Sequence, residues 1–256
     1  MMEPRRKYLR FLVFAAVLLL ITASGHFGSK WHMNTHSSVI MNRMMQQAID
    51  VASNLNPHLI KQLHFSEEDV DNPHFKLIRD QLIAFGKIIP QSGIYSMKLI
   101  DSLLVFGPES YPANHHYASK PGTVYENPDP RDFEVYLTGR PAVYGPVSDE
   151  YGTFISALAP VYDHRTGEVI LVVGIDVPLE NFREDLLRGR RIIIVAVIFT
   201  MIVFLTGSAF YFFRLKAAKT EGIRFRHVET IIIAFVLLFI SYLVVLNISK
   251  SERERN

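Results

Sequence analysis

The sequence predicts an α+β domain that is exported between membrane-anchoring helices. Three observations predict it: apolar residues gather in three nearly uncharged blocks, two helix-like stretches precede about five strand-like ones, and most of the strands are joined by short turns. Helices followed by hairpin-linked strands indicate an antiparallel sheet with helices on one face, whereas a parallel sheet would require helices and strands to alternate.

The three apolar blocks have the properties of membrane segments. Residues 192–213 and 228–248 are each about 20 residues long, the length that an α-helix needs to cross the hydrocarbon core. Residues 11–30 follow a basic stretch in residues 1–10, a pattern that fits both an uncleaved anchor and a cleavable signal peptide. The aromatic Trp31 at its far end favours the anchor, so we expect three transmembrane helices.

Basic residues predict the orientation of these segments. The stretch before the first segment and the loop at residues 214–227 together carry nine Lys and Arg residues, which places both on the cytoplasmic side. Four basic residues between 183 and 191 oppose this arrangement but are outnumbered. Residues 31–188 and the tail at 249–256 would then lie outside, giving a multi-pass protein of the plasma (inner) membrane with a periplasmic or extracellular domain.

The composition limits what the exported domain can be. The chain has no cysteine, so the domain must be held by an apolar core, and about 160 residues suffice for one. The net charge is +2, and the basic residues gather near the membrane segments. They indicate contact with lipid head groups and not with nucleic acid.

Periodicity assigns the elements of the domain in order. Apolar residues spaced three and four apart predict a helix over residues 31–55, which Asn56 and Pro57 end, and a second over 74–85. After Pro90 the period changes to two, which is typical of strands. We expect strands at residues 94–99, 102–106, 142–147, 153–162 and 168–177, a loop at 107–130 with a short strand at 123–126, and helices at 132–137 and 179–187.

Several short motifs in the second half of the domain resemble a known family. They are TGRP at 138–141, GPVSDEYG at 145–152, SALAPV at 156–161, TGEV at 166–169 and GIDV at 174–177. Together they resemble the extracytoplasmic PAS-like sensor domains called Cache or PDC domains, in which such a run marks the last three strands. The resemblance implies a PAS-like sheet behind a long N-terminal helix, and a small-molecule ligand.

Such sensor domains usually precede a histidine kinase, a diguanylate cyclase or a chemoreceptor module, and this chain departs from that architecture. We find no kinase histidine box, no GGDEF-like turn and no methyl-accepting coiled coil in it. We therefore expect no enzymatic activity from this chain. Either the chain is the N-terminal part of a longer receptor, which we favour, or it signals through a partner.

The acidic residue of the last motif, Asp176, is the first candidate for ligand binding. It ends an apolar strand, where a carboxylate is costly to bury without a partner. In the family that the sequence resembles, the corresponding Asp often binds a ligand amine. The alternative is that Asp176 caps the helix that begins near Pro178.

Polar-tipped side chains near the expected strands are further candidates for a ligand pocket. They are Tyr95, Tyr125, Tyr144, Ser156 and Tyr162. Ordinary core and cross-strand packing is the alternative for each of them. Lys98 and Arg140 could neutralise an anionic ligand or could simply face solvent.

Metal, cofactor and catalytic sites are not predicted. His32 and His36 have helical spacing and His115 and His116 are adjacent, but two histidines alone are a weak metal signal. No nucleophile constellation or phosphate-binding loop accompanies them.

The sequence therefore leads to two functional hypotheses. The first is a sensory input unit that binds a small extracytoplasmic molecule and transmits the signal through the segment at 192–213, with a homodimer formed along the helix at 31–55. The second is a membrane-anchored protein-interaction or assembly module without a small-molecule ligand. An internal pocket would favour the first hypothesis, and an exposed apolar patch without a pocket the second.

Overall fold

The computed structural model of the chain describes residues 3–89, 93–112 and 114–221, and within these ranges the side chains of residues 8–214 and 216. His36–Asp185 form one compact unit, and the outer parts of the first and last long helices belong to another. The elements in chain order are α1 (Glu3–Asn54), α2 (Pro57–Ile60), the 3-10 turn η1 (Glu67–Val70), α3 (Pro73–Ile88), β1 (Gly93–Ile100), β2 (Leu103–Phe106), α4 (Pro130–Thr138), β3 (Ala142–Ser148), β4 (Thr153–Tyr162), β5 (Val169–Pro178) and α5 (Leu179–Glu221).

The five strands form one antiparallel sheet in the order β2-β1-β5-β4-β3, which confirms the α+β prediction. The last strand of the sequence, β5, lies in the centre because it pairs with β1 on one side and β4 on the other. Its residues 171–175 are all buried, as expected for a strand covered on both faces. The expected strand at 123–126 is reduced to a single bridge between Val105 and Val124.

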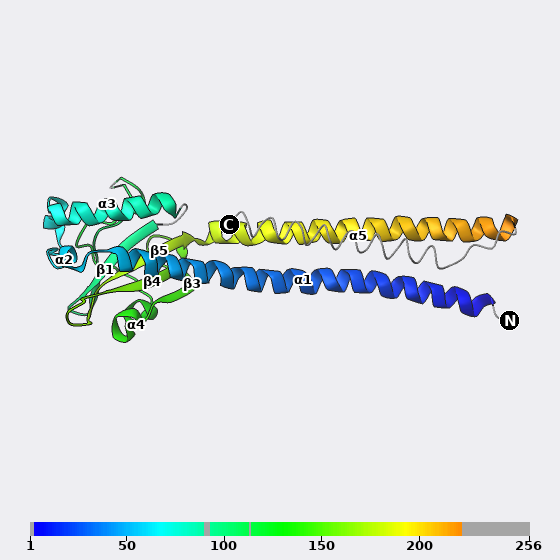
Figure 1. Cartoon of the computed structure of the whole chain (residues 1–256), viewed down its shortest axis with the longest axis horizontal. Helices are drawn as coiled ribbons and strands as arrows, with labels where there is room; N and C mark the ends of the chain where they lie inside the picture. The colour runs from blue at the N-terminus through cyan, green and yellow to red at the C-terminus, as the bar shows by residue number, and fades with distance from the viewer. Residues whose placement is uncertain (1–2, 90–92, 113, 222–256) are drawn as a thin grey trace. The chain divides into compact units, whose positions relative to one another are not determined.

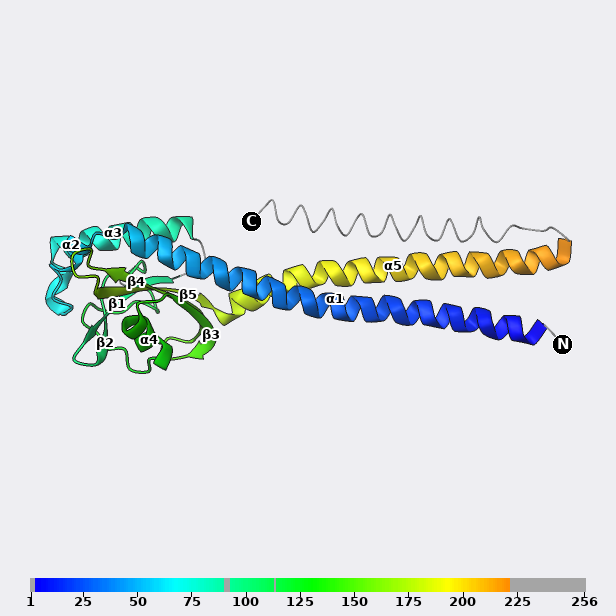
Figure 2. The ribbon, with the colours of Figure 1, turned by 60° about the horizontal axis from the view of Figure 1, so that its bottom comes forward.

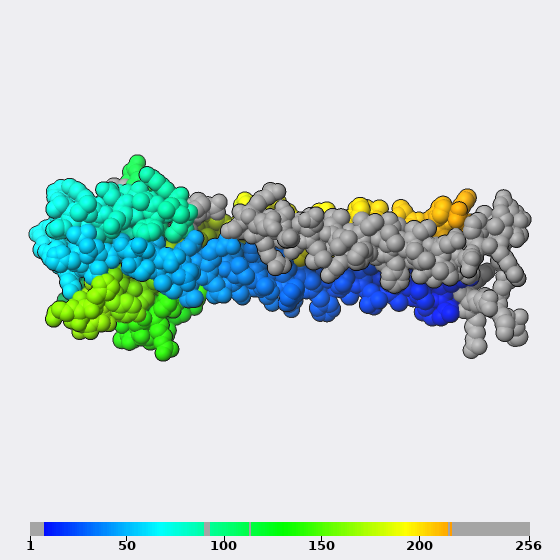
Figure 3. Space-filling model, viewed as in Figure 1, coloured from blue at the N-terminus to red at the C-terminus, as the bar shows by residue number. Residues whose placement is uncertain are grey.

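Helices cover both faces of the sheet, and the expectation of helices on one face was wrong. The C-terminal end of α1 and the whole of α3 lie on one face of the sheet, as Figures 1 and 2 show. In the space-filling view of Figure 3 these two helices cover the sheet. The short helix α4 lies on the other face and contacts β4 and β5. The sequence of α4 marks the side of the helix that buries Asp132 and Val135, but it does not record which face of the sheet the chain crosses to.

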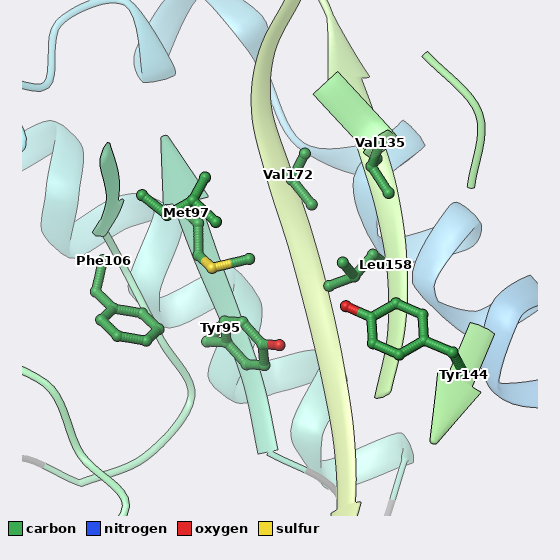
Figure 4. Close-up of a cluster of buried hydrophobic side chains, with 8 residues drawn as sticks. Tyr95, Met97, Phe106, Val135, Tyr144, Leu158 and Val172 are labelled. Carbon is green, nitrogen blue, oxygen red and sulfur yellow. The ribbon is translucent and has the colours of Figure 1, made fainter. Parts of the chain in front are cut away.

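The face under α4 holds a buried cluster that crosses the sheet from β2 to β3. It contains Tyr95, Met97, Leu104, Phe106, Val135, Tyr144, Leu158 and Val172. Figure 4 shows the rings of Tyr95 and Tyr144 on either side of β5 with their hydroxyl groups pointing toward each other. The apolar face of the sheet under α4 thus carries the hydroxyl groups of Tyr95 and Tyr144 near its central strand.

Local sequence explains where α4 begins and ends. Asp129 is its N-cap and forms a reciprocal capping box with Asp132, and Pro130 occupies the first turn. Gly139 ends the helix with a left-handed conformation, φ 62°, that favours glycine. These contacts fix Asp132 in the first turn, where its second carboxylate oxygen accepts a hydrogen bond from the hydroxyl of Tyr144 on β3.

Two helices are long and apolar enough to cross a membrane by length and composition. They lie within Tyr8–Asn54 and Leu179–Arg214, with mean hydropathy of 2.0 and 2.6 over their most apolar windows, neither of which is buried. The helix expected at 179–187 is the first part of α5, which continues without a break into the second apolar block. The expected third segment at 228–248 and the tail at 249–256 lie outside the described residues.

Candidate functional site

A small cavity lies on the α4 side of the sheet, where β1, β5 and the loop that follows β2 meet. Its volume is about 30 Å³, which is room for about two water-sized groups. Seven aromatic residues, three carboxylic acids and one serine line it: Tyr95, Phe106, Tyr111, Tyr117, Tyr125, Tyr151, Phe154, Glu109, Asp149, Asp176 and Ser119. No Lys or Arg side chain is among these lining residues.

Asp176 enters this cavity from the central strand. It lies opposite Gly93 of β1 and Ser156 of β4 in the sheet ladder, so it belongs to a strand and not to a helix N-terminus, and the capping interpretation was wrong. Tyr95 of β1 lies on the same face, and its hydroxyl donates to Asp176 Oδ1 at 3.3 Å.

A glycine makes the contact between Tyr95 and Asp176 possible. Tyr95 lies opposite Gly174, and a Cβ atom at Gly174 would lie 2.2 Å from Cζ of the Tyr95 ring. The ring can therefore cross β5 only because residue 174 has no side chain. The spacing in the GIDV motif thus has a physical reason: the glycine admits the tyrosine ring, whose hydroxyl reaches the acid two residues later.

Asp149 enters the cavity from the turn between β3 and β4. Its Oδ1 accepts the backbone N–H groups of Tyr151 and Gly152 at 2.8 and 3.0 Å. Its Oδ2 accepts the hydroxyl of Tyr125 at 2.7 Å. The acid of the GPVSDEYG motif therefore holds the turn together and ties it to the long loop.

The third acid, Glu109, comes from the loop that follows β2. It is only 6% exposed, and its Oε1 accepts the backbone N–H of Ser119 at 2.9 Å. The loop continues along β1, because Gly107 and Ser110 donate backbone N–H groups to the carbonyls of Ser96 and Ile94 at 2.8 and 2.7 Å. The edge of β1 thus positions Glu109.

Aromatic contacts connect the walls of the cavity. The Phe106 ring has centroid distances of 5.9, 5.2 and 5.8 Å to Tyr95, Tyr125 and Tyr151. Tyr117 packs edge-on against Phe154 at 5.4 Å. Rings in such a cluster present electron-rich faces that attract cations.

Burial shifts the acids at this site toward their neutral form. It raises the pKa of Asp176 to about 7, and the negative charge of Asp149 adds to the rise, which the hydroxyls of Ser156 and Tyr95 partly offset. Burial also raises the pKa of Glu109 to about 7, although the hydrogen bond from the Ser119 N–H and the positive charge of Arg79 both lower it. The pKa of Asp132, beside the cavity, rises to about 6 for the same reason, although the Tyr144 hydroxyl lowers it.

The structure brings most of the candidate residues together. Tyr95, Tyr125 and Asp176 line the cavity. Tyr144 and Ser156 lie beside it, because Tyr144 pairs with Ser156 and Ser156 with Asp176 across β3, β4 and β5.

Tyr162 and Lys98 lie elsewhere. Tyr162 is six residues beyond Ser156 on β4, about 20 Å along the strand, and its hydroxyl donates to the carbonyl of Gly139. Lys98 is three residues from Tyr95 and so lies on the opposite face of β1, 4.8 Å from the ring of Phe65.

Sequence reasoning missed the residues that the loop contributes. Glu109, Tyr111, Tyr117 and Ser119 lie in an irregular segment, where no periodicity assigns a face. The density of aromatic residues in a polar loop was the available signal. Within the described residues, no group of three His, Asp or Glu side chains is arranged to hold a metal ion.

Comparisons with known proteins find similarity among solved structures alone. No model of a protein family matches the chain, and no curated protein matches it. Among solved structures it is similar to the sensor domain of the V. cholerae histidine kinase DctB, with 12% identity over 67% of this chain and a TM-score of 0.47. It is also similar to the ligand-binding domain of the Campylobacter jejuni chemoreceptor Tlp3, with 16% identity over 67% of this chain and a TM-score of 0.41.

These structural neighbours are a sensor domain and a ligand-binding domain. The chain spans about six-tenths of their lengths, 59% for the first and 62% for the second. The Tlp3 domain was solved in complex with 4-methylisoleucine.

Proposed function

We propose that this chain is the sensory input unit of a membrane receptor and that its ligand is a small organic cation, such as an amine. One observation carries the proposal: three carboxylic acids and seven aromatic rings line one cavity without a Lys or Arg among them. Ammonium groups bind where carboxylates accept their N–H bonds and aromatic faces surround the charge. A ligand with its own carboxylate would find no basic partner in this lining.

The signal would leave the site along β5. Asp176 lies two residues before the end of β5 at Pro178, and α5 begins at Leu179 without a connecting loop. A ligand that favours one position of β5 would shift the start of a helix that continues into an apolar block. The receptor would be a multi-pass protein of the plasma membrane with this domain outside, paired in a homodimer along α1.

A melting experiment on the full chain in detergent tests the ligand class. Methylammonium and propylammonium at saturating concentration should raise the melting temperature, because a ligand at 100 times its Kd stabilises the folded state by about 2.7 kcal/mol. Propionate, which has a similar apolar part and the opposite charge, is the control and should have no effect. Stabilisation by propionate alone, or by none of the three, would contradict the proposal.

An insertion tests the route of transmission. A Gly-Ser pair placed between Arg188 and Gly189 interrupts α5 after the domain and leaves the cavity untouched. Methylammonium should still bind, whereas its effect on hydrogen exchange in α5 beyond residue 189 should disappear. Ligand-dependent exchange that survives the insertion would show that the signal takes another route.

The alternative, a protein-interaction module, has one observation in its favour. A second, open groove of about 710 Å³ lies at the other end of α4. Leu137 and Tyr162 line it, and they are 80% and 39% exposed. In that case Leu137→Lys would weaken a protein complex, and methylammonium would not stabilise the chain.

A further inference from the structure

The acids of the cavity differ in how many hydrogen-bond donors they have. The two carboxylate oxygens of Asp149 together accept three hydrogen bonds, two at Oδ1 and one at Oδ2. Asp176 accepts bonds from two hydroxyl groups, that of Tyr95 at 3.3 Å and that of Ser156, and Glu109 accepts one from the Ser119 N–H at 2.9 Å. Asp176 and Glu109 therefore retain acceptor capacity that the surrounding protein does not fill.

The groups that face these two acids supply little positive charge. Around Asp176 stand Tyr95 from β1, Ser156 from β4, Asp149 from the turn before β4, Asp132 from α4 and the loop residue Tyr111. Glu109 has one basic neighbour, Arg79 of α3, whose guanidinium donates to the carbonyl of Tyr111 at 3.0 Å. No basic side chain is among the groups that shift the pKa of Asp176.

Negative charges in a cavity with room for about two water-sized groups cannot all persist without a counter-charge. In the absence of a cation, the proton is the counter-charge available to Asp176, and for Glu109 it adds to the charge of Arg79. Burial, which raises the pKa of both Asp176 and Glu109 to about 7, agrees with this geometric argument. At neutral pH each acid is then divided between its protonated and ionised forms.

We infer that ligand binding at this site is an exchange, in which an organic cation takes the place of protons on Asp176 and Glu109. In each exchange an acid O–H bond breaks, its proton passes to the buffer, and the carboxylate accepts an N–H bond from the incoming ammonium group. This inference rests on the proposed function, because it requires that the cavity bind a cation. The receptor would then report the cation and the external pH together.

Proton exchange predicts how the affinity changes with pH. The observed affinity falls up to tenfold per pH unit for each coupled proton below the pKa of the acid, and becomes constant above it. Between pH 6 and pH 8 the affinity for methylammonium should therefore rise at least tenfold. An alkylammonium group titrates near pH 10, as a lysine side chain does, so the probe keeps its charge throughout this range.

Calorimetry on the full chain in detergent tests the inference. Methylammonium is titrated at pH 6.5 in two buffers that differ in ionisation enthalpy, and the difference in heat gives the number of protons released. We expect about one proton per ligand, and fewer in Glu109→Gln. Glu168→Gln, which removes an exposed acid outside the cavity, is the matched control and should release as many protons as the unmodified chain.

Three outcomes are distinguishable. Binding with proton release supports the exchange. Binding without release, at an affinity independent of pH, would overturn the exchange and leave the cation site standing. If neither methylammonium nor propylammonium binds at any pH between 6 and 8, the proposed function fails and the exchange fails with it.

Discussion

Two aspartates at opposite ends of β5 have opposite environments. Asp163, in the turn that leads into β5, accepts bonds from Lys61 Nζ at 2.6 Å, from the N–H of Arg165 at 3.0 Å and from the hydroxyl of Thr166 at 3.2 Å. These partners, Lys61 first, lower the pKa of Asp163 to about 2. Asp176, at the other end, accepts the hydroxyl groups of Tyr95 and Ser156 and has no basic partner among the groups that shift its pKa, which burial raises to about 7.

The difference separates a structural acid from one held for a ligand. At neutral pH the ionised Asp163 stabilises the fold, because its charge has partners that exist only in the folded state. The ionised Asp176 opposes folding, because burial penalises its charge and no ion pair compensates it within the described part of the domain. A buried carboxylic acid without a basic partner on the central strand of a sheet is common at functional sites and rare in structural cores.

The largest expected effect is on binding. Asp176→Asn removes the charge and keeps the shape, so it should weaken methylammonium binding about 10- to 100-fold, the scale of a lost charge-assisted hydrogen bond. The same change should raise the melting temperature at pH 8, because a buried charge disappears. Asp163→Asn should show the reverse pattern, with methylammonium binding retained and the melting temperature lowered. If both substitutions weaken binding equally, Asp163 and Asp176 do not differ as a structural and a ligand-binding acid.

The second prediction concerns stability and pH. Asp176 has a folded pKa above its unfolded value, so its contribution favours folding at low pH and is lost as the pH rises from about 4 through 7. Denaturant unfolding should show a loss of roughly 2–3 kcal/mol from Asp176 between pH 5 and pH 8. Asp176→Asn should flatten this slope.

Asp163 provides the matching case, because its folded pKa lies below its unfolded value. Its contribution is present above about pH 4 and is lost as the pH falls from 4 toward 2. In Asp163→Asn the slope below pH 4 should decrease, while the slope between pH 5 and pH 8 remains. If Asp176→Asn leaves the dependence of the free energy of unfolding on pH unchanged above pH 5, Asp176 is not the buried acid that causes this dependence.

The smallest expected effect comes from the glycine that admits Tyr95. Gly174→Ala places a methyl group against the ring and should destabilise the domain by about 1–3 kcal/mol, the usual cost of overpacking. It should also weaken methylammonium binding, since the Tyr95 hydroxyl leaves Asp176. Gly86→Ala in α3 is the control, because its Cβ would meet only Ser110 at an ordinary 3.5 Å. If Gly174→Ala is as stable as the control and binds normally, the ring does not need this space.

Sequence reasoning found the elements but only part of the site. Period-two and helical patterns located the five strands, α3 and α4, because each buries a continuous face. Asp176 was predicted because a carboxylate is costly to bury on an apolar strand, and Tyr95 because a ring with a polar tip suits a ligand pocket. Glu109 was not, because its position depends on how the loop bonds to β1, which no local pattern records.

Tyr162 shows the limit of reasoning from strand membership. It lies on the same strand as Ser156, yet it lines the other groove, since distance along a strand decides which pocket a side chain reaches. The mistaken expectation that helices cover one face has a similar origin. Which side of the sheet α4 takes depends on a crossing connection and not on its sequence.

A direct test of the contrast is the titration of the two carboxyl groups by carbon NMR in the full chain, with Asp163→Asn and Asp176→Asn used to assign them. We predict a midpoint near 7 for Asp176 and near 2 for Asp163, and a lower midpoint for Asp176 alone once methylammonium is bound. Midpoints near 4 for both acids, unchanged by the cation, would contradict the account.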